Sequence, residues 1–163
     1  MARIFTQTFG VVGAIIERGG KFLLVRENNE SHPDHGKWNQ PAGWIDVGES
    51  PIEAVKREVR EETGYNFLPT HVLGVYSLVR KNHPGPENTS HALKIIFDGA
   101  ISGKQNELSV DISETRWFPP EEIYAMDGQT LRDADIKDEV RDYLAGTRYP
   151  LNIIHHTIVK GDR

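Results

Sequence analysis

Three glutamates lie close together in one short stretch of the chain, at Glu58, Glu61 and Glu62. If the stretch is helical, at about 100° per residue, their side chains fall within roughly a 100° arc of the helix surface. Like charges three or four residues apart destabilise a helix, and the carboxyl-terminal half disfavours negative charge. A bound cation would offset both effects. The cluster therefore predicts an all-oxygen site for a hard ion, Mg²⁺ or Mn²⁺.

A solvated acidic face is the competing interpretation, in which the glutamates pair with arginines of the same helix and bind nothing. Two features favour the metal site. Arg57 is four residues from both Glu53 and Glu61, so one guanidinium can bridge both carboxylates and fix the rotamer of Glu61. Gly43 and Gly48 allow the preceding segment to bend sharply, so that backbone carbonyl groups approach the same face.

The segment that contains these glutamates has the local signals of a helix. Ser50 and Glu53 form a capping box, and Pro51 suits the first helical position. Gly64 provides a left-handed stop, so the pattern predicts a helix from residue 51 to residue 63. One stripe of this helix should face a core, and it consists of Ile52, Val55 and Val59.

Strands and helices alternate around this segment. Apolar, β-branched runs predict strands at 10–16, 21–25, 72–79, 93–97 and 114–118, and amphipathic patterns predict helices at 119–126 and 133–145. Gly19 and Gly20 predict a tight hairpin turn between the first two strands. Polar segments rich in Pro and Gly predict loops at 27–36 and 81–90, and the tail at 149–159 is apolar enough to dock on the body. The interleaved order predicts one α/β layered domain over residues 1–163.

The composition excludes several classes of protein. The 163 residues include 19 basic and 24 acidic side chains, for a net charge of −5, which does not suit a binder of duplex nucleic acid. No apolar run approaches the roughly 18 to 20 residues of a membrane span. With no cysteine and no signal-like leader, we expect a cytoplasmic protein without disulfides or a thiol nucleophile. The oligomeric state stays open.

Residues 43–65 resemble the Nudix box, Gly-x5-Glu-x7-Arg-Glu-U-x-Glu-Glu-x-Gly-U, in which U is aliphatic. Tyr65 replaces the last aliphatic residue. The resemblance implies the Nudix fold, an α/β/α sandwich with a mixed, partly antiparallel sheet. Every fixed position of the box is matched, at Gly43, Glu49, Arg57, Glu58, Glu61, Glu62 and Gly64.

The resemblance also implies an activity. It indicates a hydrolase that cleaves a phosphoanhydride bond by attack of water at phosphorus, with Mg²⁺ or Mn²⁺ as cofactor. The substrate would be a nucleoside di- or triphosphate, or a nucleoside diphosphate linked to another moiety. Metal binding is implied for Glu58, Glu61, Glu62 and the backbone carbonyl of Ala42. Site-shaping roles are implied for Gly43, Glu49, Arg57 and Gly64.

Two assignments stay open within this resemblance. The general base is Glu58 or Glu61, because similar enzymes place it either on the box helix or on a later loop. Glu114 is a candidate distal metal ligand, because carboxylates just before a Trp-Phe strand end recur in similar enzymes. A surface position on an edge strand is the alternative for Glu114.

Substrate contacts should come from residues outside the box. Trp38 and Trp44 flank the predicted metal-bearing turn, where either could stack on a ring or pack in the core. Asn39 and Gln40 alternate with Trp38 and could hydrogen-bond to the edge of a ring. Candidate phosphate contacts are Arg26, Lys37 and Arg80.

Two short runs suggest a subgroup. Residues 38–43 and 148–151 are similar to segments of bacterial Nudix phosphatases that act on nucleoside tri- and diphosphates and on hydroxymethylpyrimidine pyrophosphate. The alternatives are a nucleotide-sensing module without catalysis, and a pyrophosphatase specific for ADP-ribose or dinucleoside polyphosphates. The intact box disfavours the sensor. Val79 and Arg80 stand where the ADP-ribose enzymes typically have a proline, and no tyrosine matches the dinucleoside polyphosphate hydrolases.

Overall fold

Eight strands form one mixed sheet in the computed structural model, which describes residues 8–30, 33–81 and 89–160. The central strand, at residues 8–18, is parallel to the strand at 89–102 and antiparallel to the strands at 21–27 and 42–44. The strands are β1 (Thr8–Arg18), β2 (Lys21–Glu27), β3 (Trp38–Asn39), β4 (Ala42–Trp44), β5 (Asn66–Lys81), β6 (Thr89–Ser102), β7 (Ile112–Phe118) and β8 (Tyr149–Pro150).

The sheet order explains how distant segments meet. The main path is β3-β2-β1-β6-β5-β8, in which β1 and β6 are parallel. Strand β4 also pairs with β1, and β7 pairs with β2. The predicted hairpin is confirmed, with Arg18 opposite Lys21. The expectation of a mixed, partly antiparallel sheet is therefore also confirmed.

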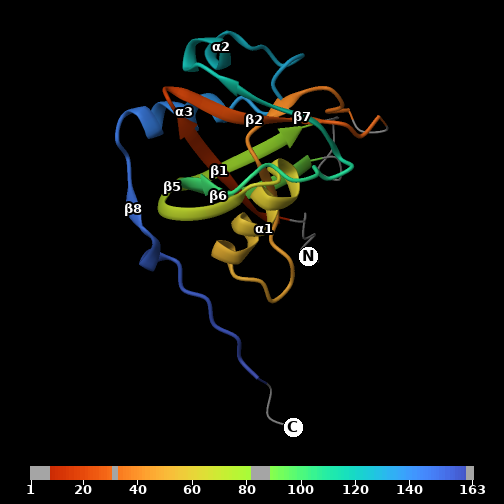
Figure 1. Ribbon diagram of the computed structural model, residues 1–163. Helices are drawn as coiled ribbons and strands as arrows, with labels where there is room; N and C mark the ends of the chain where they lie inside the picture. The colour runs from red at the N-terminus through yellow and green to blue at the C-terminus, as the bar shows by residue number, and fades with distance from the viewer. Residues whose placement is uncertain (1–7, 31–32, 82–88, 161–163) are drawn as a thin grey trace.

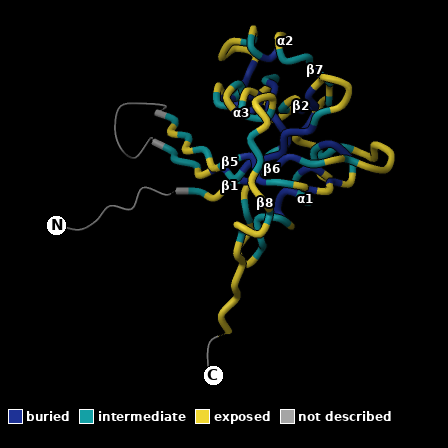
Figure 2. The backbone as a smooth tube through the Cα atoms, turned by 90° about the vertical axis from the view of Figure 1, so that its left-hand side faces the viewer, coloured by how far each residue is buried: buried dark blue, intermediate teal, exposed yellow. Residues whose placement is uncertain are grey.

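Helices cover both faces of the sheet (Figure 1). Helix α1 (Pro51–Thr63) packs on one face, and α2 (Pro120–Ala125) with α3 (Ile136–Leu144) packs on the other. Side chains alternate along β1, so Ala14 and Ile16 join the core beneath α1, whereas Ile15 joins the core beneath α2 and α3. The two cores follow the buried central strands in Figure 2. This arrangement is the expected α/β/α sandwich.

Helix α1 has the predicted bounds and caps. The backbone N–H of Glu53 donates to Ser50 Oγ at 3.2 Å, and Pro51 occupies the first helical position. Gly64 has a φ of 74°, in the left-handed region, and its N–H donates to the carbonyl of Arg60. These caps fix where the helix begins and ends, and they thereby fix which residues face the sheet.

Strands β5 and β6 extend beyond the ranges that the sequence predicts. Pro69 argues against a strand before residue 72 because it has no N–H to donate. In the structure, β8 covers only His71 and Val72 of β5, so most of the strand has one neighbour, and register shifts follow Pro69. A sheet tolerates proline at such an edge, next to a bulge.

Helix α3 begins at Ile136, three residues later than predicted. The carboxylates of Asp133 and Asp135 instead bind Arg80 and Lys94. We attribute the later start to these ion pairs, which tie residues 133–135 to the sheet.

The C-terminal tail docks only in part. A short 3₁₀ helix, η2 (Leu151–Ile153), follows β8, and Leu151 and Ile154 pack against the α1-side core. Residues 155–160 are exposed, as Figure 2 shows. The expectation that the whole tail docks is therefore wrong beyond Ile154. Among the described residues, no helix has the length and apolar character that a membrane crossing needs.

The Ser50 cap provides a test of how α1 is anchored. Ser50→Ala removes the acceptor for the Glu53 N–H and should lower the free energy of unfolding by about 1 kcal/mol. Ser50→Asp restores an acceptor and should keep most of the stability. Urea denaturation followed by circular dichroism measures both variants. Equal stability of Ser50→Ala and the unmodified protein would contradict this role of the cap.

Candidate active site

The turn before α1 lies directly against the acidic face of that helix. Strand β4 pairs with β1, which places Gly43 opposite Val12 and Ala42 opposite Gly13. A Cβ atom built on Gly43 would lie only 2.1 Å from the carboxyl carbon of Glu58. Glycine at this position therefore lets a carboxylate approach the main chain more closely than any other residue would allow.

The neighbouring residue, Ala42, binds a second carboxylate through its main chain. Its N–H donates to Glu62 Oε2 at 2.9 Å. The backbone hydrogen bonds to β1 lie on either side of residue 42. The Ala14 N–H donates to the carbonyl of Pro41, and the Ile45 N–H donates to the carbonyl of Gly10. In this alternating ladder, the N–H and carbonyl groups of residue 42 both point away from β1. The carbonyl thus faces the same edge as the amide that binds Glu62.

Arg57 forms hydrogen bonds to three carboxylates, those of Glu49, Glu58 and Glu61. Its guanidinium donates to both carboxylate oxygens of Glu49, at 2.9 and 2.8 Å, and to the carbonyl of Trp44 at 2.9 Å. The Nη1 atom donates to Glu58 at 2.6 Å and to Glu61 at 3.4 Å. One planar donor group therefore connects the loop before the helix to the acidic face.

One expected partner of Arg57 is absent from this arrangement. The helical spacing predicts a bridge from Arg57 to Glu53, but Glu53 pairs instead with Lys56 at 2.8 Å. Glu49, which lies outside the helix, takes the corresponding place beside Arg57. The prediction of a Glu53 bridge is thus wrong, because the loop before the helix folds back within reach of the guanidinium.

Burial makes two of these carboxylates difficult to ionise. It raises the pKa of Glu58, and the hydrogen bond and positive charge of Arg57 oppose the rise only in part. Burial raises the pKa of Glu62 further, against the hydrogen bond from Ala42. By contrast, the hydrogen bond from Arg57 lowers the pKa of Glu49. Two partly buried acids with raised pKa values are an environment in which a cation would be stabilised.

The residues present fit a divalent cation by their chemistry. Glu58, Glu61, Glu62 and the carbonyl of Ala42 offer only oxygen donors, which suit Mg²⁺ and Mn²⁺. Within the described ranges, no three acidic or histidine side chains already converge as a preformed metal-binding group. Arg57 and the Ala42 amide hold the carboxylates in separate hydrogen bonds instead.

Several residues that the sequence nominates lie elsewhere. Trp38 packs in the core against Phe118, with ring centroids 4.8 Å apart. Arg26 and Glu114 are opposite each other on β2 and β7 and form a half-exposed ion pair at 3.6 Å. Gln40 is buried, and its amide atoms have no hydrogen-bond partner in the described structure. In the described part of the chain, no hydrogen bond or ion pair joins any of these to the glutamates of α1.

A cavity of about 500 Å³ adjoins the turn at Ala42 and Gly43. Trp44 and Asn39 line it, as the substrate-contact prediction requires. The indole of Trp44 is 61% exposed and stacks on Phe9 at 4.6 Å between ring centroids. An exposed ring supported by a second ring is a suitable surface for a planar ligand.

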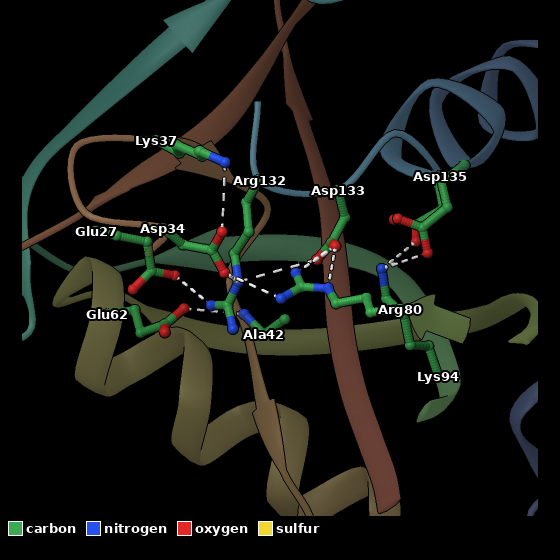
Figure 3. Close-up of polar contacts among 11 residues, drawn as sticks. Glu27, Asp34, Lys37, Ala42, Glu62, Arg80, Lys94, Arg132, Asp133 and Asp135 are labelled. Carbon is green, nitrogen blue, oxygen red and sulfur yellow. Dashed lines mark hydrogen bonds and ion pairs between the residues drawn. The ribbon is translucent and has the colours of Figure 1, made fainter. Parts of the chain in front are cut away.

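The same cavity is lined by charged residues that no sequence pattern groups together, although Lys37 and Arg80 are predicted as possible phosphate contacts. Figure 3 shows Arg80 and Arg132 among Glu27, Asp34 and Asp133, with Lys94 and Asp135 as a neighbouring pair. Lys94, within the apolar run at 93–97, is a further sequence signal, because a lysine buried in such a run needs an anionic partner. The charged residues of the lining are Asp34, Lys37, Arg80, Lys94, Arg132 and Asp133. Their cations also pair with Glu27, Asp135 and Glu139 outside the lining.

Comparisons with known proteins identify the family of the chain. A family model described as NUDIX domain matches residues 6–140. Phosphatase NudJ of Escherichia coli strain K12 is 34% identical over 149 residues, 88% of each chain. A NUDIX hydrolase from Nitrosomonas europaea is 35% identical, with a TM-score of 0.81 over 93% of this chain and 98% of that one. The MutT protein from Methanosarcina mazei Go1 is 29% identical, with a TM-score of 0.72 over 90% of this chain and 100% of that one. The chain belongs to the Nudix hydrolase family.

Proposed function

We propose that this protein hydrolyses a phosphoanhydride bond in a nucleoside di- or triphosphate, or in a nucleoside diphosphate linked to another moiety, with Mg²⁺ or Mn²⁺. Nudix hydrolases generally use divalent metal ions. The main support is one arrangement. The partly buried carboxylates of Glu58 and Glu62 lie against the Ala42–Gly43 main chain, at the margin of a cavity large enough for an organic group.

The chemistry divides between the metal and the protein. A bound divalent ion polarises phosphoryl oxygens and neutralises the charge that develops as the P–O bond breaks. Glu58, Glu61, Glu62 and the carbonyl of Ala42 would hold it. Glu58 or Glu61 accepts the proton of the attacking water. Arg57 keeps both of these glutamates in place, because it donates to each of them.

The cavity supports the placement of the substrate. Its lining begins at the turn beside the carboxylates and continues to the exposed indole of Trp44. The phosphates would lie at the acidic end and the organic group beside Trp44 and Asn39. A bacterial relative named Phosphatase NudJ, at 34% identity, supports a phosphate-releasing activity on a small molecule.

A substrate panel at fixed Mg²⁺ tests this function. It includes nucleoside tri- and diphosphates, ADP-ribose, dinucleoside polyphosphates and hydroxymethylpyrimidine pyrophosphate, and each product is identified by mass. We expect activity that chelation abolishes and added Mg²⁺ restores. Hydrolysis in ¹⁸O-water should place the label on phosphorus. Activity that survives chelation, or label found only in the organic product, would refute the proposal.

Replacing one glutamate separates catalysis from folding. Glu61 is half exposed, and among the described residues its carboxylate accepts one hydrogen bond, the long one from Arg57, so Glu61→Gln should leave the melting temperature nearly unchanged. It should lower kcat by at least about 100-fold, because the amide neither accepts a proton nor binds a hard cation well. Glu53→Gln, on the same helix, is the matched control. A folded Glu61→Gln variant with full activity would exclude this role.

The close approach at Gly43 gives a second test. In Gly43→Ala the new methyl group would overlap the carboxylate of Glu58 and push it away. We expect Mn²⁺ affinity, measured by calorimetry, and kcat each to fall by at least about tenfold. Gly10→Ala on β1 is the control, since its nearest neighbour, Ile45 Cδ1, lies 3.4 Å away. Normal Mn²⁺ binding by folded Gly43→Ala would show that Glu58 is not needed there.

A further inference from the structure

Two arginines and two aspartates form a closed ring of ion pairs on the cavity wall. Arg80 binds Asp133 through two guanidinium nitrogens and binds Asp34 at 3.0 Å. Arg132 lies 3.2 Å from Asp34 and 3.9 Å from Asp133. Each aspartate is therefore shared by both arginines. The ring joins the loop before β3, the end of β5 and the segment before α3 (Figure 3).

Two further residues of opposite charge pair with this ring and leave its net charge at zero. Lys37 pairs with Asp34 at 3.5 Å, and Glu27 accepts from Arg132 at 2.5 Å. Three cations thus face three carboxylates. We call these six residues, Glu27, Asp34, Lys37, Arg80, Arg132 and Asp133, the charge ring.

The fourth cation of the cavity wall is also paired. Lys94 donates to Asp135 at 2.8 Å and to Glu139 at 2.9 Å, and its side chain is 4% exposed. Every lysine and arginine in the described lining therefore has an acidic partner. The cations of this wall do not resemble an anion-binding site, in which unpaired lysine and arginine groups face the ligand.

This balance has a consequence for a ligand. An anion that enters the cavity loses hydration, and it recovers that loss only if a cation is available. Here each cation is already neutralised, and the nearest aspartate oxygens would repel the anion. An uncharged group meets no such penalty, and it can also contact the apolar side chains of Phe9, Val11 and Leu78 that line the cavity.

We propose that the charge ring is a specificity filter, which admits the organic part of the substrate only when that part carries no negative charge. This inference rests on the proposed function, since it assumes that the phosphates lie at the glutamates of α1. Substrates are then compounds with all their negative charge on one phosphate chain. Compounds with a further carboxylate or phosphate on the base or ring are rejected.

A pair of isosteric substrates tests the filter in the unmodified protein. The best nucleoside diphosphate of the panel is prepared with either a carboxylate or a carboxamide on its base. The two forms have nearly the same shape and differ by one charge. We expect the carboxamide to retain activity close to the parent and the carboxylate to show at least a tenfold lower kcat/KM, about the size of one unfavourable charge contact. Equal kcat/KM values would overturn the proposal.

Removing one carboxylate of the ring should relax the filter. Asp133→Asn leaves Arg80 and Arg132 with a positive charge in excess, so the ratio of kcat/KM for carboxylate over carboxamide should rise about tenfold. Asp138→Asn, an exposed position on α3, is the control and should leave the ratio unchanged. Asp34→Asn serves as a second variant if Asp133→Asn does not fold. An unchanged ratio in a folded ring variant would contradict the filter.

Binding measurements distinguish a failure of the filter from a failure of the proposed function. Calorimetry in the presence of Mg²⁺ measures the affinity of the protein for the carboxylate and carboxamide forms, even when neither is hydrolysed. For a chain that hydrolyses no panel compound, the proposed function fails, yet weaker binding of the carboxylate would still support the filter. For an active chain that binds both isosteres equally, the filter fails and the proposed function stands.

Discussion

The approach of two partly buried carboxylates to the main chain at Ala42 and Gly43 is the constraint on which the rest of the structure depends. Negative charge in a poorly hydrated place is costly unless donors or cations face it. Here the donors are one backbone amide and the guanidinium of Arg57. The capped helix, the missing side chain at Gly43 and the pairing of β4 with β1 all keep those groups within reach.

Sequence reasoning is most accurate where one local rule decides the outcome. The capping box and Gly64 give both ends of α1, and the glycine pair at 19–20 gives the first hairpin. The family resemblance supplies the layered fold. The start of α3 is missed because ion pairs to distant strands, and not helical preference, decide where Asp133 and Asp135 lie.

The candidate site is predictable only in the part that lies on one helix. Glu58, Glu61 and Glu62 share a face by spacing alone, whereas the charge ring joins residues up to 106 positions apart, from Glu27 to Asp133. No local pattern contains that information. Trp38 and Trp44 show the same limit, because identical residues six positions apart lie one in the core and one at the cavity surface.

The parallel pairing of β1 with β6 bears on the order in which the chain can assemble. Thr8 lies opposite His91, so the middle of the sheet closes only when a segment some eighty residues downstream arrives. During synthesis, the amino-terminal hairpin and helix α1 therefore emerge before the sheet on which α1 packs is complete. Contacts between such remote segments slow folding. The acidic helix thus gains its complete support late, when the second half of the polypeptide has emerged.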